Sequence, residues 1–141
     1  MARNELPESL RLGIPEVDVE HILQVQILQS ITDALGEGDG EQAYELIRQL
    51  EDVTAAHFIA EQLLMRLHAY PGYQQHEREH DQLIDELRNL EERIVAGEGD
   101  AASETRSLEL WLVHHIHTAD KAFGAFMLDR EGGSSSELQP A

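Results

Sequence analysis

The chain has 141 residues, no cysteine and a net charge of -18 at pH 7. This length predicts one domain with a closed hydrophobic core, and the absence of cysteine excludes disulfides and thiolate metal sites, so any metal must be held by nitrogen and oxygen atoms. The acidic excess, together with the lack of a secretory start and of an apolar run of membrane length, predicts a cytoplasmic protein that binds neither nucleic acid nor membranes.

The apolar residues recur with the period of a helix along most of the chain, and no stretch alternates as a strand would. Turn signals at 36–40, 70–72 and 97–100 separate four predicted helices. These helices cover residues 16–35, 41–69, 73–96 and 103–128. Because short connections between long helices make neighbours antiparallel, the predicted fold is an all-α, up-down-up-down antiparallel four-helix bundle.

This interpretation divides the chain into an N-terminal arm over 1–15, the bundle over 16–128 and a flexible tail or linker over 129–141. The arm carries no pattern that predicts an element. The tail is predicted from the glycines and serines of EGGSSSELQPA.

Histidines lie on the apolar face of every predicted helix, in one case with a glutamate. From the first helix to the fourth they are His21, His57 with Glu61, His76 with His80, and His115. In the fourth helix the period selects His115 and leaves His114 and His117 on the surface. A lone histidine on such a face is usually a hydrogen-bonded core residue. Here the bundle topology brings all five to one end of the molecule, because they come early in the first and third helices and late in the second and fourth.

The segment QQHEREH, which contains His76 and His80, also matches the H-E-x-x-H pattern of zinc peptidases. We disfavour that interpretation because Glu77 lies about 100° round the helix from His76, toward solvent, and because a compact bundle offers no cleft for a peptide. One catalytic zinc takes about three protein ligands. Two octahedral metals have about twelve positions, and five imidazoles, two bridging carboxylates and one bridging oxygen leave about one of them open for a small ligand. The pattern therefore favours a pair of irons.

Four motifs resemble those of the hemerythrins, and specifically of the bacterial single-domain type. They are GIPEVDVEH (13–21), HFIAEQLLM (57–65), YPGYQQHEREH (70–80) and WLVHHIHTAD (111–120), and together they span most of the chain. The resemblance implies two iron ions joined by an oxo or hydroxo bridge, one bound by His76, His80 and His115 and the other by His21 and His57. It also implies that Glu61 and Asp120 bridge the irons and that dioxygen binds at the open position on the two-histidine iron.

Only the resemblance places Asp120 among the ligands. Asp120 follows His115 by five residues, which is about 140° on an ideal helix, so regular geometry does not aim both side chains at one site. Either the two reach the irons from different sides, or the helix carries a local π-type distortion.

The resemblance further implies an apolar pocket beside the open position, which would exclude water and favour reversible binding. Gln24, one turn after His21, stands where an apolar residue is usual in the family. Its amide would hydrogen-bond the ligand or admit water, unless it turns to solvent at the margin of the helix face. The other implied pocket residues, each of which also fits ordinary bundle core, are Phe58, Trp111, Leu112 and Ile116.

The leading functional prediction is a non-heme di-iron protein that binds dioxygen reversibly for transport, storage or delivery, and not an enzyme. The alternative is an oxygen- or redox-sensing module of a larger signalling protein, which a natural reading frame beyond Ala141 would favour. An outward apolar line on the first helix, formed by Val19, Leu23 and Ile27, predicts a contact with a second copy or with an attached domain. Peroxidase or iron oxidase chemistry is less favoured, because ferritin-like oxidases use two E-x-x-H repeats and the one candidate here has its glutamate, Glu77, facing outward.

Overall fold

The computed structural model describes residues 15–97 and 99–138, with side chains between 18 and 129. Its elements, in chain order, are α1 (Pro15–Gly36), α2 (Gly40–Leu67), α3 (Tyr73–Ala96), α4 (Ala101–His115), the π-helical segment η3 (Ile116–Asp120) and α5 (Lys121–Leu138).

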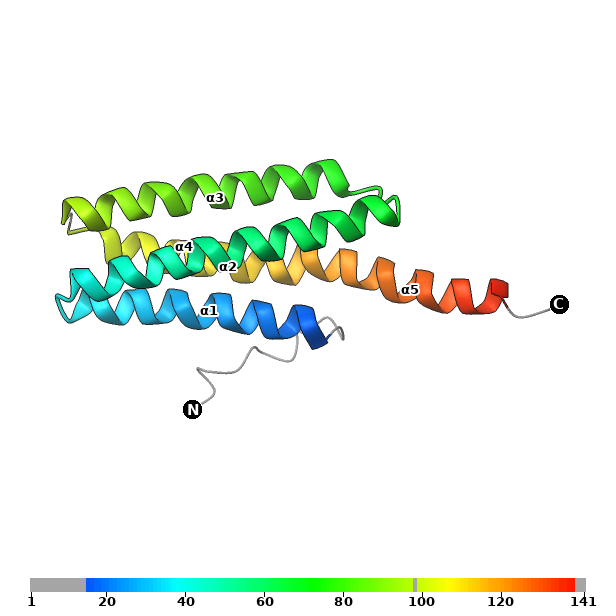
Figure 1. Cartoon of the computed structure of the whole chain (residues 1–141), viewed down its shortest axis with the longest axis horizontal. Coiled ribbons are helices and arrows are strands. Elements are labelled where there is room, and N and C mark those ends of the chain that lie inside the picture. Colours follow the sequence, from blue (N-terminus) through cyan, green and yellow to red (C-terminus); the bar gives the residue numbers. More distant parts are fainter. Residues whose placement is uncertain (1–14, 98, 139–141) are drawn as a thin grey trace.

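The helices form the predicted antiparallel four-helix bundle. The helices α1, α2 and α3 each make one arm, and α4, η3 and α5 follow one another as a continuous fourth arm (Figure 1). Within the bundle α1 packs against α2 and α4, and α3 packs against the same two helices. Each arm therefore has two neighbours, and all four enclose one interior. No helix in the part of the chain that the structure describes is long and apolar enough to cross a membrane.

Local signals set the helix ends. Asp39 caps α2 by accepting a hydrogen bond from the backbone N–H of Gln42 at 3.0 Å. The same helix ends at Leu67, slightly before the predicted end, because Ala69 adopts a left-handed backbone with φ 51°. A glycine at position 72 leaves room for the Tyr70 ring, since a Cβ there would lie 2.8 Å from that ring and would force it to shift. This turn delivers the chain into α3 at the end of the bundle that holds the histidines.

The fourth arm is longer than the sequence predicts. Its α5 continues to Leu138, past the predicted end at Leu128, and so includes much of the segment whose composition predicts a flexible linker. Extending an existing helix adds one hydrogen bond for each residue fixed, and the first proline after Asp120 is Pro140. Figure 1 shows this part of α5 projecting beyond the other three helices.

The apolar core fills the half of the bundle that lies toward the α1–α2 and α3–α4 turns. Its fully buried side chains include Leu28, Ile31, Ile47, Leu50, Leu87 and Leu90. The polar residues predicted as metal ligands occupy the other half. Burying so much aliphatic surface is the main stabilising contribution to such a fold, so the core anchors the helices that carry the site.

One residue that the sequence predicts at the surface belongs to this core. The outward apolar line is predicted to contain Ile27 with Val19 and Leu23, yet Ile27 is only 7% exposed, whereas Val19 and Leu23 are 64% and 41% exposed. Because α1 is covered by both α2 and α4, it buries a broader arc than a single apolar stripe. The outward line on α1 is therefore shorter than predicted.

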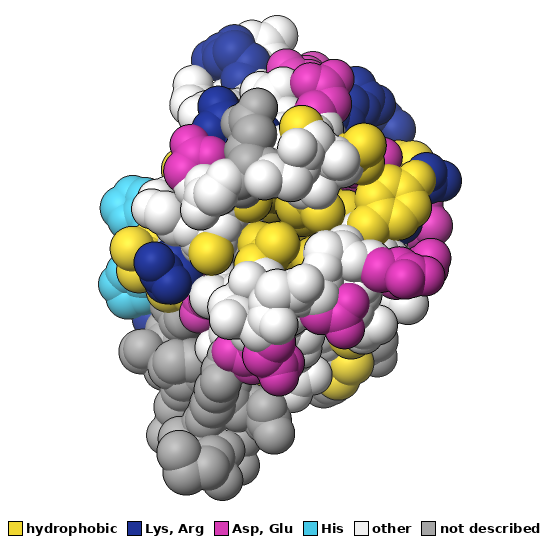
Figure 2. Space-filling view, turned by 90° about the vertical axis from the view of Figure 1, so that its left-hand side faces the viewer, with side chains coloured by type: hydrophobic (Ala, Val, Ile, Leu, Met, Phe, Trp, Pro, Cys, Tyr) yellow, Lys and Arg dark blue, Asp and Glu magenta, His cyan; other side chains and the backbone are white. Residues whose placement is uncertain are grey.

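The opposite end of the bundle, away from the histidines, is shallowly hollowed. Figure 2 views this end and shows apolar side chains at its centre, with acidic and basic side chains around them. The hollow has a volume of about 250 Å³ and is lined by both turns, with Leu35, Ile94, Ala101 and Ala102 as its larger members.

Candidate metal centre

The seven predicted ligands meet in the bundle interior, each at most 3% exposed. They come from all four arms: His21 from α1, His57 and Glu61 from α2, His76 and His80 from α3, His115 from α4 and Asp120 from η3. Donor atoms of these side chains form two groups, in each of which all atoms lie within 4.8 Å of one another. The sequence prediction that the histidines converge at one level of the bundle thus agrees with the structure.

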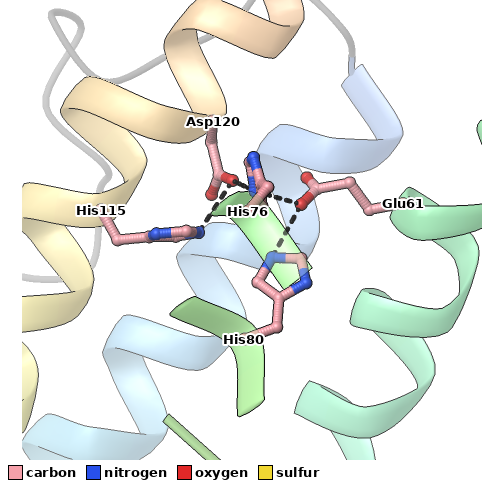
Figure 3. Close-up of side chains that lie close together, drawn as sticks. All are labelled: Glu61, His76, His80, His115 and Asp120. Carbon is pink, nitrogen blue, oxygen red and sulfur yellow. Dashed lines mark hydrogen bonds and ion pairs between the residues drawn. The ribbon is translucent and has the colours of Figure 1, made fainter. Parts of the chain in front are cut away.

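The first group contains three imidazoles and two carboxylates: Glu61, His76, His80, His115 and Asp120 (Figure 3). His76 Nε2 is central, at 2.7 Å from Asp120 Oδ1 and 2.9 Å from Glu61 Oε1. His80 Nε2 lies 3.1 Å from Glu61 Oε1, and His115 Nε2 lies 3.1 Å from Asp120 Oδ1. Each of these two carboxylate oxygens thus lies beside two of the three ring nitrogens, and His76 Nε2 is shared between them.

The second group contains His21, His57 and the same two carboxylates. His21 Nε2 lies 3.0 Å from Asp120 Oδ2, and His57 Nε2 lies 3.6 Å from Glu61 Oε2. Glu61 and Asp120 therefore each direct one oxygen to the three-histidine group and the other oxygen to the two-histidine group. A carboxylate shared in this way is suited to bridging two metal ions.

A π-helical turn explains how Asp120 reaches the same interior as His115. The five residues Ile116–Asp120 are π-helical, with wider hydrogen-bonded turns than the flanking α-helices. Both Asp120 and His115 are consequently buried, at 1% exposed. Of the two alternatives that the sequence leaves open for Asp120, the structure contains the local distortion.

The inward atoms of the site are short of hydrogen bonds. Although they lie near opposite charges, none of the following buried atoms makes a hydrogen bond of good geometry to any described group: the Nε2 atoms of His21, His57, His80 and His115, and both carboxylate oxygens of Glu61. Buried polar atoms in folded proteins nearly always have partners. Imidazole nitrogens and carboxylate oxygens in this arrangement are also the donor set that iron accepts, so the residues fit a pair of such ions.

The mutual contacts of these side chains shift the pKa values of the proposed metal ligands. Burial alone would raise the pKa of Asp120, but the adjacent imidazoles of His115, His21 and His76 hold it well below its usual range. Burial lowers the pKa of His76, yet the adjacent Asp120 and Glu61 outweigh that effect and raise it to about 9. Burial keeps the pKa of His80 below its usual value. Asp120 is thus ionised, as a ligand must be, while a metal has to displace the proton of His76.

Three residues outside the two groups bind the imidazole rings at Nδ1, the nitrogen that faces away from the shared carboxylates. The contacts are Glu20 to His57 Nδ1 at 2.5 Å, Gln62 to His80 Nδ1 at 2.9 Å and Glu79 to His115 Nδ1 at 2.7 Å. Partners of this kind fix the tautomer and direction of a ligating imidazole. Sequence reasoning missed all three. The available signal is position, since each lies next to a predicted ligand, about 100° round its helix and so toward the neighbouring helix.

The predicted pocket residues lie around the same rings. Phe58 stacks on His80 with ring centroids 3.6 Å apart, and Trp111 stacks on His115 at 5.1 Å. Leu112 and Ile116 are fully buried. Gln24 is also fully buried, so it does not turn to solvent, and its amide donates to Thr54 Oγ1 at 3.2 Å.

Other candidates lie outside the two groups. His114 and His117 are exposed, as the helical period predicts. Glu77 of the H-E-x-x-H match accepts a hydrogen bond from the Tyr73 hydroxyl at 2.7 Å and belongs to neither group. The structure thus supports the pair His76 and His80 but not the zinc peptidase interpretation of that motif.

Comparison with known proteins points to one family. A family model described as the hemerythrin HHE cation binding domain matches residues 12–126. The chain is 30% identical to a bacteriohemerythrin of Pseudomonas aeruginosa over 139 residues, covering 98% of this chain and 88% of the relative. It is 28% identical to a bacteriohemerythrin of Methylococcus capsulatus over 76% of this chain and 82% of the relative. It is also 31% identical to a myohemerythrin of Sipunculus nudus over 80% of this chain and 84% of the relative.

Proposed function

The chain belongs to the hemerythrin family, and from this premise we propose that it holds two iron ions in the bundle interior and binds dioxygen reversibly. The observation that carries the proposal is the division of the Glu61 and Asp120 oxygens between a three-histidine and a two-histidine group. In this proposal His76, His80 and His115 hold one iron, His21 and His57 hold the other, and the two carboxylates bridge them.

A pair of ferrous ions would supply the two electrons and the open coordination position that dioxygen binding needs. The protein's own contribution is to orient the ligands and to limit the access of water. Glu20, Gln62 and Glu79 fix three imidazoles from outside, and the buried Leu112 and Ile116 contribute apolar walls. An apolar surround disfavours loss of oxidised products, so the site favours release of dioxygen unchanged over catalysis.

The test is oxygen cycling of the iron-loaded, reduced protein, with variants chosen for position. His57→Ala removes a proposed ligand of the two-histidine iron, while His114→Ala removes an exposed histidine outside both groups. We expect wild type and His114→Ala to gain a visible charge-transfer band in air and lose it under argon, and His57→Ala to show no reversible band. Equal behaviour of the two variants would contradict the ligand assignment.

A second candidate function, oxygen or redox sensing, is favoured by the position of Asp120. This proposed bridging residue ends η3 and is followed directly by α5, which projects beyond the bundle (Figure 1). A change at the irons would therefore have a direct mechanical connection to α5. Hydrogen–deuterium exchange separates the two roles: a sensor shows a change in α5 protection between the oxygen-free and oxygenated protein, whereas a carrier shows none.

A further inference from the structure

The outer partners of the imidazoles follow one another round the bundle. A residue on α1 holds a ring on α2, a residue on α2 holds a ring on α3, and a residue on α3 holds a ring on α4. The pairs are Glu20 with His57, Gln62 with His80, and Glu79 with His115. Each holder is the chain neighbour of a proposed ligand, preceding it on α1 and α3 and following it on α2.

The series is interrupted between α4 and α1. By the same rule, the holder of His21 would be the residue after His115. That residue is Ile116, the first residue of η3, which is apolar and fully buried. His21 Nδ1 is accordingly buried, with no hydrogen-bond partner within the described part of the chain. If Nε2 of this ring binds a metal, Nδ1 carries a hydrogen that needs an acceptor.

One turn further along α1 lies a buried hydrogen-bond acceptor that lacks a donor. Gln24 is fully buried one turn after His21, and its Oε1 atom has no hydrogen-bond partner among the groups described. Its Nε2 atom donates to Thr54 Oγ1 at 3.2 Å, and Thr54, also fully buried, lies one turn before His57 on α2. A buried donor and a buried acceptor, neither satisfied, thus lie on neighbouring turns beside the two-histidine group.

We propose that Gln24, oriented by Thr54, is the outer partner of His21 and holds its ring through one buried water molecule. The inference rests on the proposed function only in assuming that His21 Nε2 faces a metal. A water accepts from His21 Nδ1–H and donates to Gln24 Oε1, and the Thr54 hydroxyl donates to the water while accepting from the Gln24 amide. These contacts give the water the two to four polar partners that a buried water requires. Gln24 is therefore a positioning residue of the two-histidine site.

The test measures anaerobic binding of Fe²⁺ by competition, with two ions resolved per chain. Outer-partner substitutions typically weaken metal binding about 10- to 100-fold. We expect Gln24→Leu to weaken one of the two ions by that factor and leave the other unchanged. Gln24→Glu, which keeps an acceptor oxygen at the same reach, should restore tight binding, and Thr54→Val should weaken the same ion to a smaller degree.

The matched control is Thr105→Val. Thr105 is equally buried, but its hydroxyl bonds to Ala101 O at the start of α4, outside the metal-binding groups. This variant should bind both ions as wild type does. If Gln24→Leu also binds both ions as wild type does, the proposal is overturned. If Gln24→Leu fails to fold, Thr54→Val decides in its place, and wild-type binding of both ions by that variant overturns the proposal.

Thermal unfolding of the metal-free protein provides a readout that is independent of iron. A Gln24 oxygen that is truly without a partner is destabilising, so Gln24→Leu would then raise Tm. A bridging water predicts instead that Gln24→Leu lowers Tm. A wild-type chain that binds fewer than two irons would contradict the proposed function, while a rise in Tm for Gln24→Leu would still overturn the role proposed for Gln24.

Discussion

Removing the metal should destabilise this protein more than most single substitutions would. In the metal-free chain, buried inward atoms of the histidines and of Glu61 lack hydrogen bonds of good geometry, and each such atom costs about 1–3 kcal/mol. Coordination to two ions would satisfy them together. The expected effect is therefore large enough to measure by thermal unfolding.

Mass action gives the size of the shift. An ion present at about a thousand times its Kd stabilises the folded state by about 4 kcal/mol, so two sites contribute about 8 kcal/mol. For a chain of this length each kcal/mol moves Tm by about 4 °C. We expect iron loading under argon to raise Tm by about 30 °C, measured by circular dichroism at 222 nm.

A ligand variant and an exposed variant make this experiment specific. Asp120→Ala removes an oxygen from each group, so it should lose at least half of the gain on loading. His117→Ala, which alters an exposed histidine outside both groups, should keep all of it. The reasoning is refuted if wild type unfolds at the same temperature with and without iron, or if the two variants gain equally.

Three further outcomes are expected. Burial is the largest cause, and the adjacent Glu91 the next, of a rise in the pKa of Glu51 from 4.5 to about 7. Between these two values the folded state binds more protons than the unfolded state, so the free energy of unfolding falls as pH rises. The Tm of Glu51→Gln, measured by thermal unfolding, should consequently fall less than the Tm of wild type when the pH is raised from about 5 to about 8. Trp111, the only tryptophan, stacks on His115, so its fluorescence should fall on iron loading, and unchanged emission would count against a metal at that ring. Ile31→Ala should cost about 2–5 kcal/mol of unfolding free energy in denaturant titration while two irons still bind, because Ile31 belongs to the apolar half.

The helical period is sufficient to predict the bundle and six of the seven proposed ligands, all except Asp120. Buried apolar residues and inward histidines share one face of a helix, so the same periodicity reveals both. It also distinguishes His115 from its exposed neighbours His114 and His117. These are local properties of one helix, which a single sequence contains.

Local distortions of a helix, and features that depend on a neighbouring helix, could not be predicted in this way. The regular helical period does not indicate a π-helical turn, so only the family resemblance indicates Asp120 as a ligand. One apolar stripe per helix predicts an exposed Ile27, whereas α1 is covered from two sides. The helical period does not predict that Glu20 binds His57 or that Thr54 binds Gln24, because each contact joins two different helices.

The most direct test of a reversible di-iron oxygen site is the amount of dioxygen bound by the reduced, iron-loaded chain. An oxygen electrode and metal analysis on the same sample give the ratio of gas to iron. Because two irons share one open position in this proposal, we predict two irons and one dioxygen per chain, with the gas recovered under argon. Uptake that argon does not reverse, or a chain that holds a single metal ion, would contradict reversible oxygen binding at a di-iron centre.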